Sequence, residues 1–149
     1  MASTKEKITA TALALFAQRG YDGVSVRDIC KQVGIKESSL YYHFPSKQAI
    51  LTTLLSHFEN RAAEGMAQLE QALGDQQGPW GQVSYRMVCQ AFFEGYLMDP
   101  FCNQVLRLLQ MEQFHNPDLG EIYERWMFRV PLAFQGRMFT ALVDLGLLH

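Results

Sequence analysis

The sequence lacks most of the patterns that carry enzyme chemistry. Its three cysteines, Cys30, Cys89 and Cys102, are far apart, and none belongs to a Cys-x-x-Cys pair. Scattered cysteines in an odd number are typical of reduced core residues. The four histidines have no metal-ligand spacing, and the glycine patterns that bind dinucleotides or phosphates are missing. We therefore expect no catalytic residues, no metal and no cofactor.

Membrane and strand patterns are also missing. No apolar run approaches the ~20 residues that span a bilayer, and the N-terminus has no charged and apolar signal segment. There is no sustained alternation of apolar and polar residues and no internal repeat. With 48% hydrophobic residues, the 149-residue chain can bury a core. We expect a cytoplasmic, all-α protein.

The formal charge of −2 is unevenly distributed along the chain. Residues 1–47 carry seven basic and four acidic side chains, a formal +3, whereas residues 48–149 carry six basic and eleven acidic ones, a formal −5. A basic head on an acidic body orients the N-terminal part toward a polyanion.

Residues 25–47 have the pattern of two short helices joined by a sharp turn. Ser25 is expected to cap the first helix, and Gly34 to close it in the left-handed conformation. The second helix should run from Lys36 to about Phe44, because the residue before Pro45 is pushed out of the helical region. The first helix has one apolar stripe, formed by Val26, Ile29, Cys30 and Val33.

The second of these helices has two contrasting faces. Leu40 and Phe44 fall on one side, whereas Ser38, Tyr41 and Tyr42 fall on the other. Hydroxyls and rings of this size suit phosphate oxygens, base edges and thymine methyls in a major groove. Ser46 should cap the next helix and place Lys47 in its first turn, where an ammonium can hold a phosphate. The pattern predicts a helix-turn-helix for DNA.

This stretch, Leu40-Tyr41-Tyr42-His43-Phe44-Pro45-Ser46-Lys47, together with the preceding residues 16–23, resembles the DNA-binding domain of the TetR family of transcriptional repressors. The resemblance covers about the first third of the chain. The resemblance implies contacts to the groove and to phosphates. We add Lys36 because of its charge, and Tyr42 because it falls on the same side of the helix as Tyr41. The expected DNA-binding residues are Arg27, Lys36, Glu37, Ser38, Ser39, Tyr41, Tyr42, His43 and Lys47.

The resemblance also implies how such a protein works. A homodimer would place two recognition helices in successive major grooves of a palindromic operator. Members of the family usually have two further helices after the point where this chain ends, and those helices form most of the dimer interface. We therefore expect the body to be incomplete at its C-terminal end or the dimer to be built differently.

The rest of the chain reads as helices. Ser3 and Glu6 have the spacing of a capping box for a first helix, and a long helix is expected from Ser46 to Leu73. Gly65 inside it marks a bend or a close helix contact. After a linker at 74–79, helices are expected at about 80–98, 101–114, 116–130 and 132–148. The first of these four is buried all round or lines a cavity, and Pro131 kinks or ends the third.

We expect two domains, a DNA-binding head of residues 1–47 and a helical body of residues 48–149 that binds a small molecule and dimerises. Aromatic and methionine side chains with interleaved polar groups offer adaptable walls for an apolar ligand. The candidates are Met87, Phe92, Phe93, Glu94, Tyr96, Arg107, Met111 and Trp126. The alternative is an architectural or recruiting DNA-binding module without small-molecule control, whose body is a solid core. A void of several hundred Å³ with converging polar groups would favour the sensor, and close packing throughout would favour the module.

Overall fold

The computed structural model describes residues 2–74, 85–144 and 146, and all of its elements are helical. This part of the chain contains no strand, so the predicted all-α class is confirmed. The elements are α1 (Thr4–Arg19), α2 (Val26–Val33), α3 (Glu37–His43), α4 (Lys47–Gly74), α5 (Tyr85–Phe92), the π-helix η2 (Phe93–Leu97), α6 (Pro100–Glu112), α7 (Pro117–Glu124), the π-helix η3 (Arg125–Arg129) and α8 (Val130–Asp144).

Local capping sets the first two helices. The Ser3 hydroxyl accepts from the backbone N–H of Glu6, and the Glu6 carboxylate accepts from the backbone of Ser3, so the predicted capping box of α1 is confirmed. Ser25 and Asp28 form the same arrangement at the start of α2. Gly34 ends α2 in the left-handed conformation at φ 80°, as predicted. These caps satisfy backbone groups that helix termini leave unpaired.

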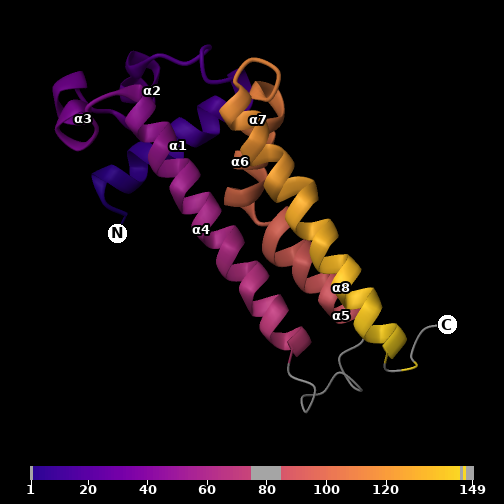
Figure 1. The fold of residues 1–149 in the computed structure, drawn as a ribbon. Helices are drawn as coiled ribbons and strands as arrows, with labels where there is room; N and C mark the ends of the chain where they lie inside the picture. The colour runs from indigo at the N-terminus through magenta and orange to yellow at the C-terminus, as the bar shows by residue number, and fades with distance from the viewer. Residues whose placement is uncertain (1, 75–84, 145, 147–149) are drawn as a thin grey trace.

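Helix α4 connects the two ends of the molecule. Figure 1 shows it running from α1–α3 down the length of the body, beside α6 and α8. The Ser46 hydroxyl accepts from the N–H of Ala49 at 3.1 Å, which confirms the predicted cap. One apolar stripe of α4 is buried in a core that continues from α1 into α8. Its buried members are Ile50, Leu51, Leu54, Phe58, Ala62 and Met66.

Two expectations about the body are corrected. Of the two outcomes predicted for 80–98, burial on every side is wrong, because Phe93 is 56% and Met98 is 68% exposed, whereas Phe92 and Tyr96 do line a cavity. A close helix contact at Gly65 is also wrong for the described part of the chain, since a Cβ added there would meet none of its atoms within 4 Å, and a bend there stays a prediction. Residues 75–84, which include most of the predicted linker, lie outside the described residues. Among the described helices, none is both long and apolar enough to cross a membrane.

Pro131 does not end its helix, contrary to one of the two predicted outcomes. Figure 1 shows α7 continuing into α8, and the π-helix η3 lies immediately before Pro131. In η3 the N–H of Val130 donates to the carbonyl of Arg125, five residues back. In the same pattern, the residue that would donate to the Trp126 carbonyl is Pro131, but proline has no N–H. The Tyr96 hydroxyl donates to this carbonyl instead, at 2.9 Å in a buried position.

We expect Tyr96→Phe to lower the free energy of unfolding by about 1–3 kcal/mol, because it leaves the Trp126 carbonyl buried without a donor. Burial raises the pKa of the Tyr96 hydroxyl, so it remains a donor at neutral pH. Urea unfolding of the two proteins measures the difference. Tyr123→Phe is the control, since its hydroxyl makes no hydrogen bond within the described residues. Equal losses in the two variants would show that Tyr96 does not have this role.

Candidate nucleic-acid interface

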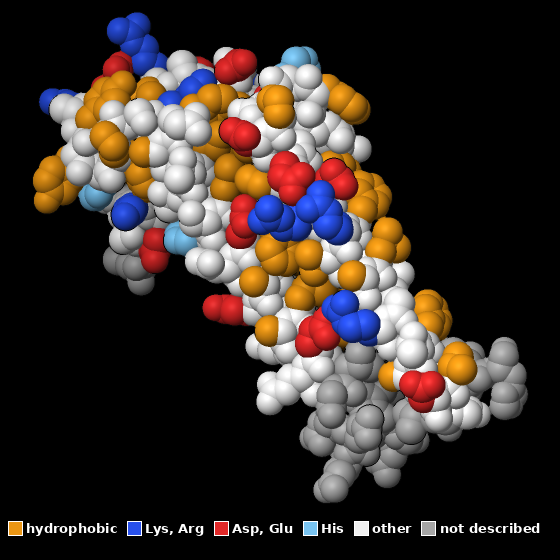
Figure 2. Space-filling model, in the orientation of Figure 1, with side chains coloured by type: hydrophobic (Ala, Val, Ile, Leu, Met, Phe, Trp, Pro, Cys, Tyr) orange, Lys and Arg blue, Asp and Glu red, His pale blue; other side chains and the backbone are white. Residues whose placement is uncertain are grey.

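Helix α3 presents its tyrosines to solvent. Leu40 is fully buried and Phe44 nearly so, whereas Tyr42 is 86% and Tyr41 48% exposed. Hydrophobic side chains protrude at the far left of the molecule in Figure 2, over α3. The predicted division of this helix into a buried and an exposed side is therefore confirmed. The exposed side belongs to a single α-helix, and a major groove admits an α-helix.

The turn before α3 fixes its direction. The N–H groups of Gly34 and Ile35 both donate to the Cys30 carbonyl, at 2.9 and 3.0 Å. Ile35 then packs against the core that contains Leu40. These contacts bring the N-terminus of α3 beside α2. There the Arg27 Nε donates to the Glu37 Oε1 at 2.9 Å, so two predicted DNA-binding residues form an exposed ion pair.

The remaining predicted contacts on α3 lie around the tyrosines. Lys36 and Ser38 are exposed, and Ser39 and His43 are half-buried. The His43 ring meets the Tyr42 ring edge to face, with 5.2 Å between the centroids. Together with Arg27, Glu37 and the two tyrosines, these side chains form one surface, which we call the α3 face.

Lys47 differs from the other predicted DNA contacts, because its ammonium is held within the protein. It donates to the carbonyls of Tyr21 and Val24, both at 2.9 Å, and lies 4.1 Å from the centre of the Tyr21 ring. Two of its three N–H bonds are therefore used to join the turn after α1 to the start of α4. A phosphate contact by Lys47 stays a prediction, and only the third N–H bond of its ammonium is left for it.

Two side chains near the start of α2, Asp28 and Tyr21, have shifted pKa values. Hydrogen bonds from the hydroxyl and the backbone N–H of Ser25 lower the pKa of the Asp28 carboxyl. Burial, together with the negative charge of Asp22, raises the pKa of the Tyr21 hydroxyl. At neutral pH the cap is therefore ionised and the Tyr21 ring under Lys47 is neutral.

A contact between the head and α6 was not foreseen from the sequence. The Glu112 Oε1 accepts from the backbone N–H of Tyr21 at 2.9 Å. Gly20 makes this approach possible, because its φ is +76° and an added Cβ would lie 3.0 Å from the same oxygen. Met111, a predicted ligand contact, lies at this junction, with its Cε 3.7 Å from that Cβ position. No sequence pattern indicates a carboxylate bonded to a backbone 91 residues away.

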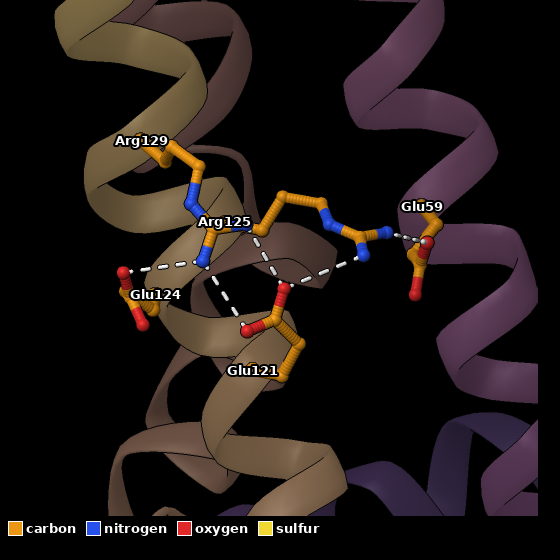
Figure 3. Close-up of polar contacts among 5 residues, drawn as sticks. All are labelled: Glu59, Glu121, Glu124, Arg125 and Arg129. Carbon is orange, nitrogen blue, oxygen red and sulfur yellow. Dashed lines mark hydrogen bonds and ion pairs between the residues drawn. The ribbon is translucent and has the colours of Figure 1, made fainter.

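Ion pairs also join α4 to η3 and α7. Figure 3 shows Arg125 reaching from η3 to Glu59 on α4, with 3.8 Å between the charged groups, and to Glu121 at 3.5 Å. Arg129 binds Glu121 and Glu124, at 3.0 and 3.2 Å, and its hydrogen bond lowers the pKa of the Glu121 carboxyl. These groups form the charged cluster at the centre of the face in Figure 2. Exposed pairs add little stability singly, but the network joins three elements, α4, α7 and η3.

The predicted ligand-binding residues do not converge on one site. Phe92 and Tyr96 line a cavity of about 160 Å³ between α4 and η2, and Phe92 and Phe93 line another of about 80 Å³ between α5 and α8. Trp126 is buried nearby, and its Nε1 finds no hydrogen-bond partner among the described residues.

The other ligand candidates lie apart from these cavities. Glu94 is exposed and accepts from the Gln90 amide at 2.8 Å, and Arg107 is exposed on α6. The side chain of Met87 lies outside the described residues. The described part of the chain contains no group of three His, Cys, Asp or Glu side chains that could hold a metal ion. The ligand contacts therefore stay predictions, and Phe92 and Tyr96 are the two that share the larger of these cavities.

Comparisons with known proteins find sequence matches to the head. Residues 8–54 match the family model described as bacterial regulatory proteins, tetR family. The negative transcriptional regulator IcaR of the biofilm operon icaADBC in Staphylococcus aureus is 54% identical over 46 residues, which are 31% of this chain and 25% of IcaR. The transcriptional regulator YuxN of Bacillus subtilis is 45% identical over 58 residues, 38% of this chain and 20% of YuxN. The matches thus span a quarter or less of these relatives.

Solved structures extend the likeness in fold to the body. A transcriptional regulator from Aquifex aeolicus has a TM-score of 0.63 at 19% identity, covering 97% of this chain and 81% of that one. A TetR-family regulator from Mesorhizobium loti has a TM-score of 0.62 at 23% identity, covering 96% of this chain and 69% of that one. The sequence match places residues 8–54 in the tetR family of bacterial regulatory proteins, and the likeness of the body to these solved structures is one of fold.

Proposed function

We propose that this protein is a cytoplasmic, sequence-specific transcriptional repressor that reads its operator with the α3 face. The observation that carries the proposal is the exposure of Tyr41 and Tyr42 on a helix whose opposite side is fixed in the core by Leu40 and Phe44. Neighbouring exposed aromatic side chains form an apolar patch, and exposed apolar patches mark interaction sites. The relative IcaR, a negative regulator by name, supports repression.

Charge favours DNA as that partner. The formal +3 of residues 1–47 attracts phosphates, and the formal −5 of residues 48–149 directs the body away from them. Lys36 is exposed at the N-terminus of α3, and Arg27 lies beside it on α2. Two copies acting as a dimer would present two α3 helices to successive major grooves, about 34–36 Å apart, on a palindromic operator.

Control by a small molecule is the second part of the proposal. Helix α4 begins in the head at Lys47 and lines the cavity of about 160 Å³ with Arg61 and Leu69. Glu112 of α6 binds the backbone of the head directly. A ligand that binds one position of α4 better than another would shift the spacing of the two α3 helices.

Selection from a randomised duplex pool tests the DNA-binding part. We expect a palindromic sequence to be enriched, and its affinity to fall steeply as salt rises, because each phosphate contact releases a counterion. Fluorescence anisotropy at several salt concentrations measures the slope. The proposal would be wrong if the folded protein bound no sequence more tightly than random duplex at moderate salt.

A further inference from the structure

Two glycines line the cavity between α4 and η2 with no structural need for glycine. Gly65 lies in the interior of α4 and Gly95 in η2. Neither has a positive φ, and a Cβ added to either would meet no atom of the described residues within 4 Å. Glycine inside a helix costs about 1 kcal/mol relative to alanine. The chain therefore keeps space open at two positions on opposite walls, although alanine would fit and would stabilise both helices.

The size and walls of this cavity match one aromatic ring. Its volume is about 160 Å³. A closed apolar cavity of about 150 Å³ is known to hold benzene. This cavity has a similar volume but is open to solvent on one side, where five of its lining residues are exposed. Met66 and Leu69 of α4 and the Phe92 and Tyr96 rings supply apolar walls, and Phe92 and Tyr96 meet each other at 5.4 Å between centroids.

One basic side chain lies at the cavity, in an ion pair with an acidic one. Of the ten described residues that line it, Arg61 alone is charged. Its guanidinium is about half exposed and donates one hydrogen bond to Asp99 through Nη2, at 2.6 Å. Four of its five N–H bonds remain, and this planar group matches the geometry of a carboxylate. The Gln68 amide adds a neutral donor on the same helix.

We propose that this cavity binds a single-ring aromatic carboxylate, with the ring in the space at Gly65 and Gly95 and the carboxylate at Arg61. An effect of this ligand on DNA binding rests on the proposed function, in which a small molecule controls operator binding. Binding itself is a property of the cavity. The two can therefore be tested separately.

The test uses benzoate, benzamide and benzylamine as probes of the whole chain, by isothermal titration calorimetry without DNA. These three molecules share the ring and differ in charge. We expect benzoate to bind at about 1 mM or below, and the other two more weakly. Gly65→Ala and Gly95→Ala should each weaken benzoate binding about tenfold or more, because a methyl group occupies part of the ring's space. Arg61→Gln should remove the preference for benzoate over benzamide.

Gly136→Ala is the matched control. Gly136 lies within α8, an added Cβ there also meets nothing within 4 Å, and the residue does not line this cavity. All three alanine variants should melt at a higher temperature than the wild type, which excludes misfolding as a cause of lost binding. Only the two cavity variants should lose benzoate.

Three results would overturn the inference. They are absence of benzoate binding to the wild-type protein, equal binding by Gly65→Ala and Gly136→Ala, and a change of oligomeric state in Gly65→Ala by analytical ultracentrifugation. The last result would assign the open space to a second copy of the chain. If benzoate binds as expected but does not change operator affinity, the cavity assignment stands and small-molecule control of DNA binding fails.

Discussion

Tyr42→Ala is expected to weaken operator binding by about ten- to a hundredfold while leaving the melting temperature unchanged. The Tyr42 side chain is 86% exposed, so its removal takes almost nothing from the core. A direct contact to a base edge contributes about 1–3 kcal/mol, which corresponds to this range of affinity. The measurement is fluorescence anisotropy with the selected duplex at fixed salt. Tyr42→Phe separates the contribution of the hydroxyl from that of the ring.

Phe114→Ala provides the matched control for this experiment. Phe114 is also 86% exposed, but it follows α6 on the body rather than lying on the α3 face. Its removal should leave operator affinity within about twofold of the wild type, because Phe114 does not lie on the α3 face. Equal losses in both variants would mean that the α3 face is not the DNA-binding surface.

Leu40→Ala is expected to lower the free energy of unfolding by about 2–5 kcal/mol, the usual cost of truncating a fully buried leucine. Leu40 is fully buried, and α3 has only seven residues. A helix of that length is not stable alone in water, so its attachment to the core determines whether it forms. The N-cap residue Lys36 gives no side-chain hydrogen bond to compensate. Urea unfolding followed by circular dichroism measures the loss.

Ser38→Ala on the exposed side of the same helix is the comparison for Leu40→Ala. It should change the free energy of unfolding by less than about 0.5 kcal/mol. Operator binding should fall in both variants, in Leu40→Ala through loss of the folded helix and in Ser38→Ala through loss of a contact. If Leu40→Ala unfolds at the same urea concentration as Ser38→Ala, the core does not hold α3 in this way.

The head could be predicted closely from the sequence because its signals are local. Ser25 and Asp28 are three residues apart, Gly34 takes the left-handed conformation at the position of the turn, and Pro45 follows the end of α3 directly. Lys47 shows the limit of such reasoning. Its partners are the backbone carbonyls of Tyr21 and Val24, and a carbonyl is present at every residue, so nothing in the sequence marks these two.

The body could be predicted only as a set of helices. Apolar periodicity identifies which residues are in a helix but not which helices meet. For this reason Met111 and Phe92 were both predicted as ligand contacts, although Met111 lies beside the head and Phe92 lines the cavity. Polar residues in an apolar run were equally ambiguous. Glu94 is satisfied by Gln90 one turn away, whereas Glu112 reaches the backbone of Tyr21. Both contacts depend on how the chain folds back on itself.

The π-helix η3 changes how this chain should be aligned with its relatives. Buried residues of α7 and η3 fall seven apart at Leu119 and Trp126, and those of α8 fall seven apart at Pro131 and Met138, but Trp126 and Pro131 are separated by five. A π turn holds one residue more than an α turn. Deleting one residue from 125–129 would therefore rotate the apolar side of α8 by about 100° away from the core. A homologue with a regular helix here should align only with a single-residue gap inside the helix, where sequence alignments ordinarily forbid one.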